Sequence, residues 1–218
     1  MDEKIIKEVV DEVVNKISEQ TKVSPAGFNE YNIPIGVSNR HLHVSREDLD
    51  ILFGQGYSLT NIKDLSQPGQ FACEETVTLI GPKGVKEKVR ILGPVRKNTQ
   101  VEISITDSYQ LGVSPAVRES GDIEGTPGIS VSGPRGVVKL EKGAIIAKRH
   151  IHMTPEEADL FGVRDKQVVA VEIAGPRKLI FDNVIVRISK DFKLDLHIDT
   201  DEANAAAATT GMRAKLIK

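Results

Sequence analysis

Residues 39–53 read NRHLHVSREDLDILF, and residues 148–161 read KRHIHMTPEEADLF. Both stretches run Arg-His-x-His, then an apolar residue, then Ser or Thr, then an acidic segment that ends in apolar residues and Phe. The two copies lie 109 residues apart, from His41 to His150, which is half of the 218-residue chain. Solenoids repeat every ~20–50 residues, so a period this long indicates an internal duplication instead.

Each copy predicts a β-strand that turns directly into a short helix. Residues i and i+2 of a strand point to the same face, so each His-x-His pair presents two imidazoles to one point. Ser45 and Thr154 stand where a hydroxyl can accept from the first helical N–H groups, with an acidic residue three positions on, as in a capping box. Pro155 also suits the first position of a helix.

All five histidines of the chain belong to these two pairs or stand alone at His197. Imidazole is the commonest protein ligand for zinc and related ions, so the histidines are candidate metal ligands. A polar position on an edge strand would be the simpler explanation of one pair, but it explains two matching pairs poorly.

Composition excludes several classes of function. The net charge is −2, from 29 basic and 31 acidic residues, so no broad polyanion-binding surface is expected. The chain has no tryptophan and only 4% aromatic residues, which disfavours base-stacking nucleic-acid modules. We find no apolar run of about 18 residues and no secretory signal pattern. Cys73 is the only cysteine, so no intrachain disulfide can form and a cytoplasmic setting is expected.

The first 20 residues differ from the rest of the chain. Residues 1–20 read MDEKIIKEVVDEVVNKISEQ, in which apolar pairs recur about every four residues, as in an amphipathic helix. Residues 21–30, with Pro and Gly, read as a linker. The helix could dock a partner, or it could pack on its own domain, and the pattern does not decide between the two.

From residue 31 onward the sequence is mainly β in character. Residues 77–94, 128–148 and 168–188 each hold two β-branched runs around a Gly-Pro-basic turn, a pattern that favours small barrels or sandwiches. Further short helices are expected at about 115–120 and from near Thr200, where TDEANAAAA supplies a cap, early acids and an alanine run. Taken alone, the pattern suggests two sequential halves.

With these features in view, the chain resembles the propanediol-utilisation phosphotransacylases, the phosphate propanoyltransferase family. The resemblance covers roughly residues 32–217. Several long motifs in the same order carry it: IPIGVSNRHLHVS, LSQPGQFACEETVTLIGPKG, ILGPVRKNTQVEIS, GTPGISVSGP, IIAKRHIHMTPEEAD and LHIDTDEANAA.

The resemblance implies a mainly β fold of two tandem small β-barrels with short capping α-helices. The first barrel would be discontinuous, built from residues 31–39 plus 148–217. The second would take residues 40–147, with an excursion at about 54–74. Residues 1–20 resemble the encapsulation peptides that direct some members into bacterial microcompartments, and the family implies a homodimer.

The resemblance also implies a site with two zinc ions. His41, His43 and Glu102 would hold one zinc ion, and His150, His152 and His197 would hold the other, with waters completing its sphere. Arg96 would bind phosphate. Outside the family context, Glu102 could simply face water and Arg96 could solvate a loop. The motifs name no residues that contact coenzyme A.

The implied reaction moves an acyl group between coenzyme A and inorganic phosphate. Zinc can polarise a thioester carbonyl or stabilise a departing thiolate, and an arginine fork can pair with two phosphate oxygens. The substrate would be propanoyl-CoA or acetyl-CoA, because one methylene changes binding by only ~1–3 kcal/mol. Two alternatives remain: a zinc-dependent acyl-CoA hydrolase, and a non-catalytic scaffold stabilised by metal. Cys73 could form an acyl-enzyme in principle, but a lone cysteine is more often inert.

Overall fold

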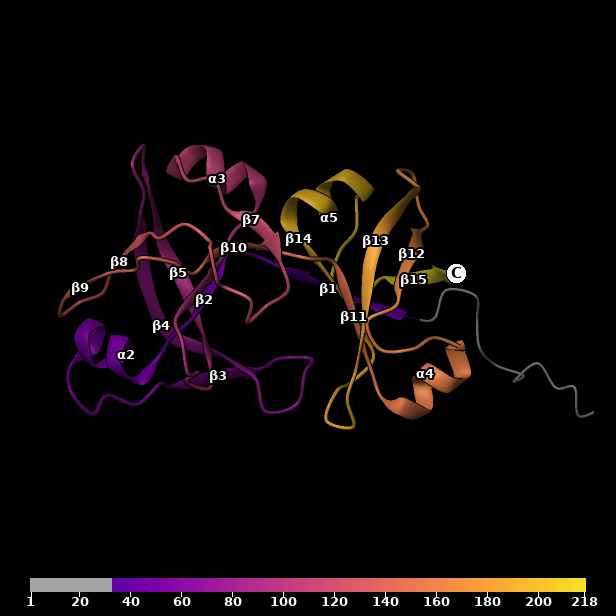
Figure 1. Ribbon diagram of the computed structural model, residues 1–218, viewed down its shortest axis with the longest axis horizontal. Coiled ribbons are helices and arrows are strands. Elements are labelled where there is room, and N and C mark those ends of the chain that lie inside the picture. Colours follow the sequence, from indigo (N-terminus) through magenta and orange to yellow (C-terminus); the bar gives the residue numbers. More distant parts are fainter. Residues whose placement is uncertain (1–32) are drawn as a thin grey trace, which may run out of the picture. The chain divides into compact units, whose positions relative to one another are not determined.

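The two His-x-His pairs lie on short strands, β2 (His41–His43) and β11 (His150–Met153), in which every residue is buried. The computed structural model describes residues 33–218, and Figure 1 shows their arrangement. The predicted N-terminal helix (residues 1–20) and linker (residues 21–30) lie outside the described residues. Within the described part the fold is mainly β with four short helices.

Strand β1 and the C-terminal half together form a closed six-stranded barrel in the order β1-β14-β11-β13-β12-β15. Apolar residues alternate along its strands and fill one core, as in the buried, partly buried pattern of β12. The remaining barrel strands are β1 (Ile33–Ser38), β12 (Val168–Ile173), β13 (Leu179–Ile188), β14 (Asp195–Asp199) and β15 (Arg213–Ile217).

The other half forms a nine-stranded sheet around a second, separate apolar core. Its pairing path runs β7-β10-β6-β2-β5-β4-β8-β9, with β3 beside β4. The end strands, β7 and β9, do not pair with each other, so pairing closes one barrel only, and the second barrel stays a prediction. The strands are β3 (Asn61–Asp64), β4 (Phe71–Ile80), β5 (Val85–Gly93), β6 (Gln100–Glu102), β7 (Ala116–Arg118), β8 (Ser130–Ser132), β9 (Val137–Lys139) and β10 (Ala144–Ala147).

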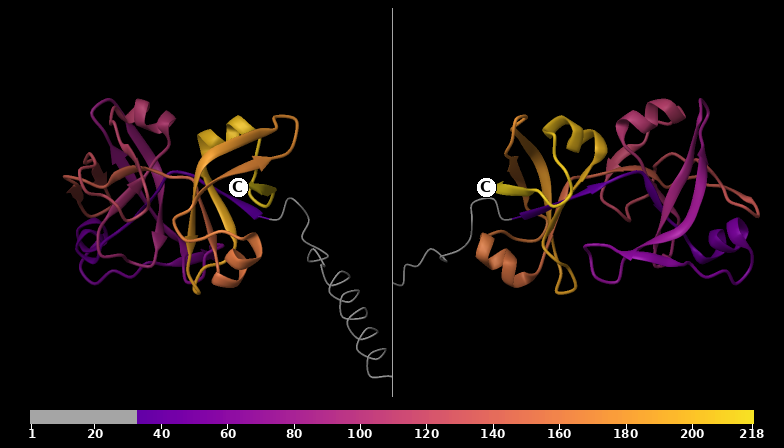
Figure 2. Two further views of the ribbon diagram at one scale, coloured as in Figure 1. Left: turned by 45° about the vertical axis from the view of Figure 1, so that its right-hand side comes forward. Right: turned by 180° about the vertical axis from the view of Figure 1, so that it is seen from behind.

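Two strands are exchanged between the halves. Strand β1 directly precedes β2 in the chain, yet it pairs with β14 in the barrel. Strand β10 directly precedes β11, yet it pairs with β6 and β7 in the nine-stranded sheet. The chain therefore crosses from one core to the other at residues 39–40 and again at residues 148–149. Figure 2 shows β1, in indigo, running from the barrel toward the other half.

Four helices start from the strands that carry the predicted ligands. They are α2 (Arg46–Phe53), α3 (Ile105–Leu111), α4 (Pro155–Phe161) and α5 (Thr200–Ala206). Each helix begins after an N-cap residue whose side chain accepts from the amide of the third helical residue. The caps, Ser45, Ser104, Thr154 and Asp199, each stand two residues after the last predicted ligand of the strand.

The sequence-based helix assignments are partly confirmed. Helices α2 and α4 start where the repeats predict, and Thr154 with Glu157 forms the full capping box. In α2 the bond runs one way, from the Asp48 amide to Ser45, because the Asp48 carboxylate accepts from Thr99 instead. The helix expected at about 115–120 is wrong.

The error at residues 115–120 has a physical reason. Ser114-Pro115 resembles a helix start, but the following residues form β7, which pairs in parallel with β10. The helix lies earlier, as α3, and begins after Ser104, whose hydroxyl accepts from the Asp107 amide. Ser104 directly follows the alternating residues 100–103 (QVEI), which predict a strand, so the sequence pattern gives no sign that a helix begins there.

Two of the three predicted Gly-Pro turns, at Gly81 and Gly133, bind the ends of helices. The amide of Lys83 donates to the carbonyl of Leu111 at the end of α3, and the amide of Arg135 donates to the carbonyl of Leu52 near the end of α2, each at 3.0 Å. These bonds satisfy carbonyls that a helix leaves unpaired at its C-terminus. A methyl group on Gly133 would lie 2.5 Å from the Leu52 carbonyl oxygen, so only glycine allows this approach.

We expect Gly133→Ala to destabilise the protein by about 1–3 kcal/mol, because the added methyl group must displace the end of α2. Urea unfolding should show this as a lower transition midpoint. Arg135→Ala, in the same turn, removes an exposed side chain and keeps the amide that binds Leu52, so it should cost no more than about 0.5 kcal/mol. Equal midpoints for the two variants would contradict the assigned role of the turn.

Candidate metal centre

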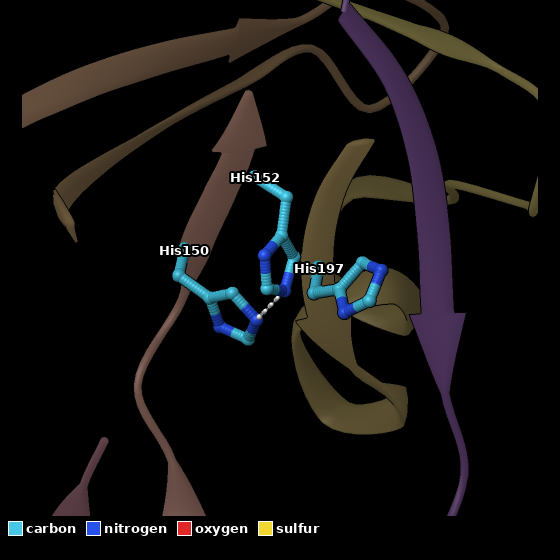
Figure 3. A group of neighbouring side chains, drawn as sticks. All are labelled: His150, His152 and His197. Atoms are coloured by element: carbon cyan, nitrogen blue, oxygen red, sulfur yellow. Dashed lines mark hydrogen bonds between the residues drawn. The ribbon is translucent and has the colours of Figure 1, made fainter. Parts of the chain in front are cut away.

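The fold gathers the six predicted ligands into two groups. One contains His41, His43 and Glu102, and the other contains His150, His152 and His197. Within each group, one ligand atom per residue lies within 4.8 Å of the others. All six residues line one pocket of about 690 Å³. Figure 3 shows the imidazoles of His150 and His152 in contact and that of His197 beside them, with its ring centroid 5.0 Å from each of the other two.

The two groups are built on the same strand register. Antiparallel pairing of β2 with β6 places His41 opposite Glu102, and antiparallel pairing of β11 with β14 places His150 opposite His197. The internal duplication therefore extends to the third member of each group, although Glu102 and His197 lie at different distances along the chain. Directly opposed residues of an antiparallel pair have neighbouring side chains, which explains how each group assembles.

Backbone carbonyls fix the orientation of the first histidine in each pair. His41 Nδ1 lies 2.8 Å from the carbonyl oxygen of Asn39, and His150 Nδ1 lies 2.7 Å from that of Lys148. A carbonyl oxygen only accepts, so Nδ1 carries the proton and Nε2 keeps a free lone pair. This hydrogen bond to the second ring nitrogen is typical of histidines that bind metals.

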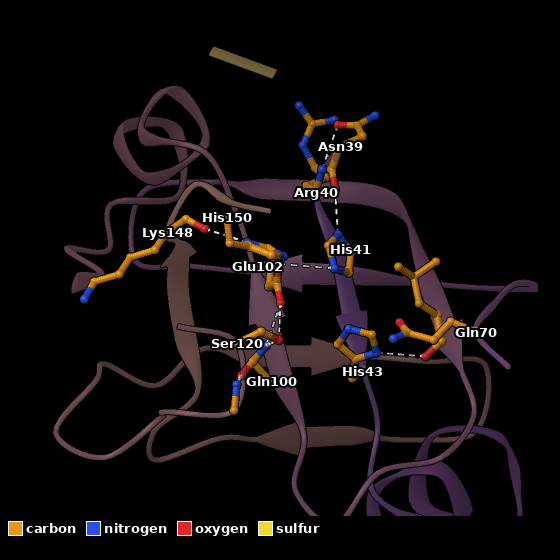
Figure 4. Close-up of polar contacts among 12 residues, drawn as sticks. Asn39, Arg40, His41, His43, Gln70, Gln100, Glu102, Ser120, Lys148 and His150 are labelled. Atoms are coloured by element: carbon orange, nitrogen blue, oxygen red, sulfur yellow. Dashed lines mark hydrogen bonds and ion pairs between the residues drawn. The ribbon is translucent and has the colours of Figure 1, made fainter. Parts of the chain in front are cut away.

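Glu102 is held by one carboxylate oxygen only. Its Oε1 accepts from Gln100 Nε2 at 2.7 Å and from Ser120 Oγ at 2.8 Å, while its Oε2 lies 3.4 Å from His41 Nε2 (Figure 4). Burial by itself would raise the pKa of Glu102, but the neighbouring imidazoles and the Ser120 hydrogen bond lower it to about 2. The side chain is therefore ionised near neutral pH, and Oε2 faces the histidines.

Burial keeps three imidazoles neutral. It lowers the pKa of His43 to about 3 and that of His152 to about 2, with further lowering by neighbouring histidines. Burial and His197 lower the pKa of His150 to about 4. Neutral imidazole is the form that coordinates a metal, so these three histidines can bind a cation without first losing a proton.

The second group also shows that a cation would fit. His150 Nε2 and His152 Nε2 lie 3.0 Å apart, and the buried His152 Nδ1 has no hydrogen-bond partner. Because His150 carries its proton on Nδ1, its Nε2 can only accept, and one nitrogen of His152 stays unsatisfied in either tautomer. A buried unsatisfied polar atom costs about 1–3 kcal/mol. Taken together, the two groups offer imidazoles and one carboxylate, a donor set that suits zinc.

Asp195 belongs to this site and was not predicted from the sequence. Its side chain is buried, and its Oδ2 lies 3.0 Å from His197 Nε2. In register it lies opposite His152, just as Gln100 lies opposite His43. The i, i+2 rule that identifies His-x-His could have found it, because Asp195-x-His197 and Gln100-x-Glu102 follow the same alternation.

Arg96 reaches the same pocket from the segment after β5. Its amide donates to the Val44 carbonyl at 2.9 Å, and its guanidinium lies 3.3 Å from Ser120 Oγ and 3.4 Å from Gln70 Oε1. Among the ion pairs of residues 33–218, none involves Arg96. Burial lowers the pKa of Arg96, the Glu102 carboxylate opposes this shift, and nearby Arg187, which also lines the pocket, adds to the lowering. An anion bound here would relieve the repulsion between the two guanidinium groups.

Cys73 is separated from these groups. It is fully buried in the core of the nine-stranded sheet and does not line the pocket. Burial, with help from the Glu75 carboxylate, raises the pKa of its thiol to about 11. A buried thiol with a raised pKa is a poor nucleophile near neutral pH.

In residues 33–218, no helix is long and apolar enough to cross a membrane.

Comparison with known proteins identifies the family of this chain. A sequence model of the phosphate propanoyltransferase family matches residues 34–209. The phosphate propanoyltransferase of Thermotoga maritima is 57% identical over 204 residues, covering 93% of this chain and 96% of the relative. That of Clostridioides difficile is 50% identical over 216 residues, covering 99% of both chains. That of Alkaliphilus metalliredigens is 46% identical over 218 residues, covering 100% of both. The chain therefore belongs to the phosphate propanoyltransferase family, a family of acyltransferases.

Proposed function

We propose that this protein is a phosphate acyltransferase that interconverts acyl-CoA plus phosphate with acyl phosphate plus coenzyme A. Propanoyl-CoA is the expected substrate, and acetyl-CoA is the alternative that differs by one methylene. One observation carries the proposal: both ligand groups and Arg96 line a single pocket. A reaction between an anion and a thioester needs a cationic anchor and an electrophilic centre within reach of each other.

Two zinc ions are the proposed resident metals. His41, His43 and Glu102 would hold one, and His150, His152 and His197 would hold the other. When bound, zinc supplies a Lewis acid that polarises the thioester carbonyl and stabilises the departing thiolate. The carbonyls of Asn39 and Lys148 hold the protons of His41 and His150 on Nδ1, which leaves the Nε2 lone pairs free to coordinate a metal. Gln100 and Ser120 keep one oxygen of Glu102 occupied, which leaves the other to bind.

The role proposed for Arg96 is to bind and align phosphate. Its guanidinium lies beside the Gln70 and Ser120 side chains and forms no direct ion pair within residues 33–218, while the Glu102 carboxylate, which accepts from Ser120, favours its charged form. Two parallel N–H groups can hold two oxygens of one phosphate, which leaves a third oxygen to attack the acyl carbon. The proton of hydrogen phosphate ends on the thiol of coenzyme A, so the overall balance requires no protein base.

The remaining expectations are also proposals. The protein would act as a homodimer in the cytoplasm, and residues 1–20 would direct it into a bacterial microcompartment. The proposed domains are residues 31–39 plus 148–217 and residues 40–147, with the excursion at about 54–74. The excursion contributes Ser66, whose Oγ lies 3.5 Å from His197 Nε2.

The first test is release of coenzyme A from propanoyl-CoA by the zinc-loaded protein, with and without phosphate. We expect release to depend on phosphate, because the acyl group must pass to a phosphate oxygen. A reagent that releases a coloured product when it reacts with a thiol measures the released coenzyme A directly. Equal release without phosphate would identify a hydrolase, and no release with either acyl-CoA would favour a scaffold.

Arg96→Ala should raise the KM for phosphate at least ~10-fold, since one charge-assisted pair is worth about 1.5–3 kcal/mol. The KM for propanoyl-CoA should change less than ~3-fold. Steady-state kinetics with each substrate varied in turn separates the two effects. Arg135→Ala removes an exposed guanidinium outside the pocket and serves as the control. Equal loss of affinity for both substrates would refute the assigned role of Arg96.

Cys73→Ala should keep at least about half of the wild-type kcat, because the raised pKa and the burial of the thiol exclude it from the reaction. The native protein should also react with a thiol reagent at pH 8 at least ~100-fold more slowly than the same protein in urea. Inactivity of a folded Cys73→Ala variant would instead support an acyl-enzyme.

A further inference from the structure

Two ion pairs stand at equivalent places in the two halves. Arg40 Nε lies 2.8 Å from Asp107 Oδ2, and Arg149 Nε lies 3.2 Å from Glu202 Oε1. Each arginine directly precedes the first histidine of a His-x-His strand, at the point where the chain crosses from one core to the other. The proposed reaction uses neither pair.

The two carboxylates also occupy matching positions. Asp107 is the third residue of α3 and Glu202 is the third residue of α5, counted from the N-cap in each helix. Helix α3 begins after the strand that ends at Glu102, and α5 begins after the strand that carries His197. Each ion pair therefore joins the strand with two ligands to the helix that follows the third ligand. The sequence repeat does not reveal this, because one helix uses Asp and the other Glu.

Both carboxylates have further partners that hold them in place. The Asp107 side chain is only 1% exposed, and its Oδ1 also lies 3.1 Å from Lys86 Nζ. Glu202 uses its Oε2 to accept from the Asp199 amide at 2.9 Å, which leaves Oε1 for Arg149. Asp107 is buried, and a buried charge needs such compensation. Burial raises the pKa of Glu202 to about 7, while the Asp199 amide and Arg149 favour its charged form.

The two helices are also linked to each other. The amide of Thr106, in the first turn of α3, donates to Asp201 Oδ2, in the first turn of α5, at 2.8 Å. Thr106 neighbours Asp107 and Asp201 neighbours Glu202 in the chain. Both ion pairs therefore belong to one junction, to which each ligand group is attached by its own arginine.

Each arginine contact lies next to the end of a short strand pairing. Strand β2 shares only three residue pairs with β6, and His41 and Glu102 form the terminal pair. Strand β11 meets β14 in the same way, with His150 opposite His197 at the end of the paired segment. Each His-x-His strand is also paired on its other side, β2 with β5 and β11 with β13, and these ladders end at the same two histidines. The arginine one residue earlier adds a side-chain contact beyond the end of the backbone pairing.

We propose that Arg40–Asp107 and Arg149–Glu202 are positioning pairs, each of which sets the distance between the His-x-His strand and the third ligand of its own group. This inference rests on the proposal that the two groups hold metal. Each pair keeps three donors together in the metal-free protein, so the metal does not have to order them when it binds. Outer contacts that orient ligands commonly contribute ~10–100-fold to metal affinity.

The test uses the near-isosteric variants Asp107→Asn and Glu202→Gln of the full chain, stripped of metal and then titrated with zinc against a competing chelator. Long-range ¹H–¹⁵N spectra of the histidine side chains identify which group fills at each step. Asp107→Asn should weaken zinc binding ~10–100-fold at His41, His43 and Glu102, and less than ~3-fold at the other group. Glu202→Gln should show the converse.

Asp50→Asn is the matched control. It breaks the 2.6 Å ion pair between Arg46 and Asp50 on α2, a helix that follows no third ligand. Both zinc affinities should stay within ~3-fold of wild type, because this pair joins no ligand strand to another element. Arg40→Gln and Arg149→Gln provide second variants that leave Asp107 paired with Lys86 and Glu202 in its capping box, so a folding failure of the first variants leaves the question answerable.

The outcomes separate this inference from the proposed function. Unchanged affinities in both variant pairs, or an equal loss at both groups that merely follows lower stability, would overturn the positioning role alone. A wild-type protein that binds no zinc would overturn the metal assignment and the positioning role together. Loss confined to the group attached to the altered pair would support the inference, because a general loss of stability would not select one group.

Discussion

Strands that follow each other directly in the chain bury their apolar side chains in two different hydrophobic cores. Strand β1 buries Ile33 and Ile35 in the barrel, and only a few residues later β2 buries Leu42 in the other core. Strands β10 and β11 repeat this crossing in the opposite direction. Because apolar burial fixes the chain on both sides of each crossing, the residues just beyond it have little freedom. His41 and His150 stand there, which places the start of each ligand group where the fold is held from two sides.

Much of this arrangement could be predicted from local sequence. The repeated Arg-His-x-His, the caps Ser45 and Thr154 and the Gly-Pro hairpins each depend on residues close in the chain, and the structure confirms these elements. The exchange of β1 and β10 could not be read from the pattern, because a strand's alternation shows which face is buried but not which strand lies beside it. The same limit hides the match between Glu102 and His197, which only the strand register reveals.

The misplaced helix and the neighbours of the site show a related limit. Ser104 caps α3 at the end of a β-branched run, so tertiary pairing of β7 decides what the local signals at Ser114 and Pro115 could not. Gln70 and Ser120 reach Arg96 from loops, where no periodicity marks them. The metal and phosphate roles of the predicted residues stay predictions, although the fold brings those residues to one pocket.

The two halves also differ in the pair of residues that faces each His-x-His strand. Strand β6 reads Gln100-x-Glu102, in which an amide supports a carboxylate that faces the histidines. Strand β14 reads Asp195-x-His197, in which a carboxylate contacts an imidazole instead. Each of these two strands therefore carries one buried carboxylate, Glu102 or Asp195, but its place in the two-residue alternation is reversed. Because the register is shared, the change altered the donor set without moving the strands, and it left one group with a carboxylate donor and the other with imidazoles alone.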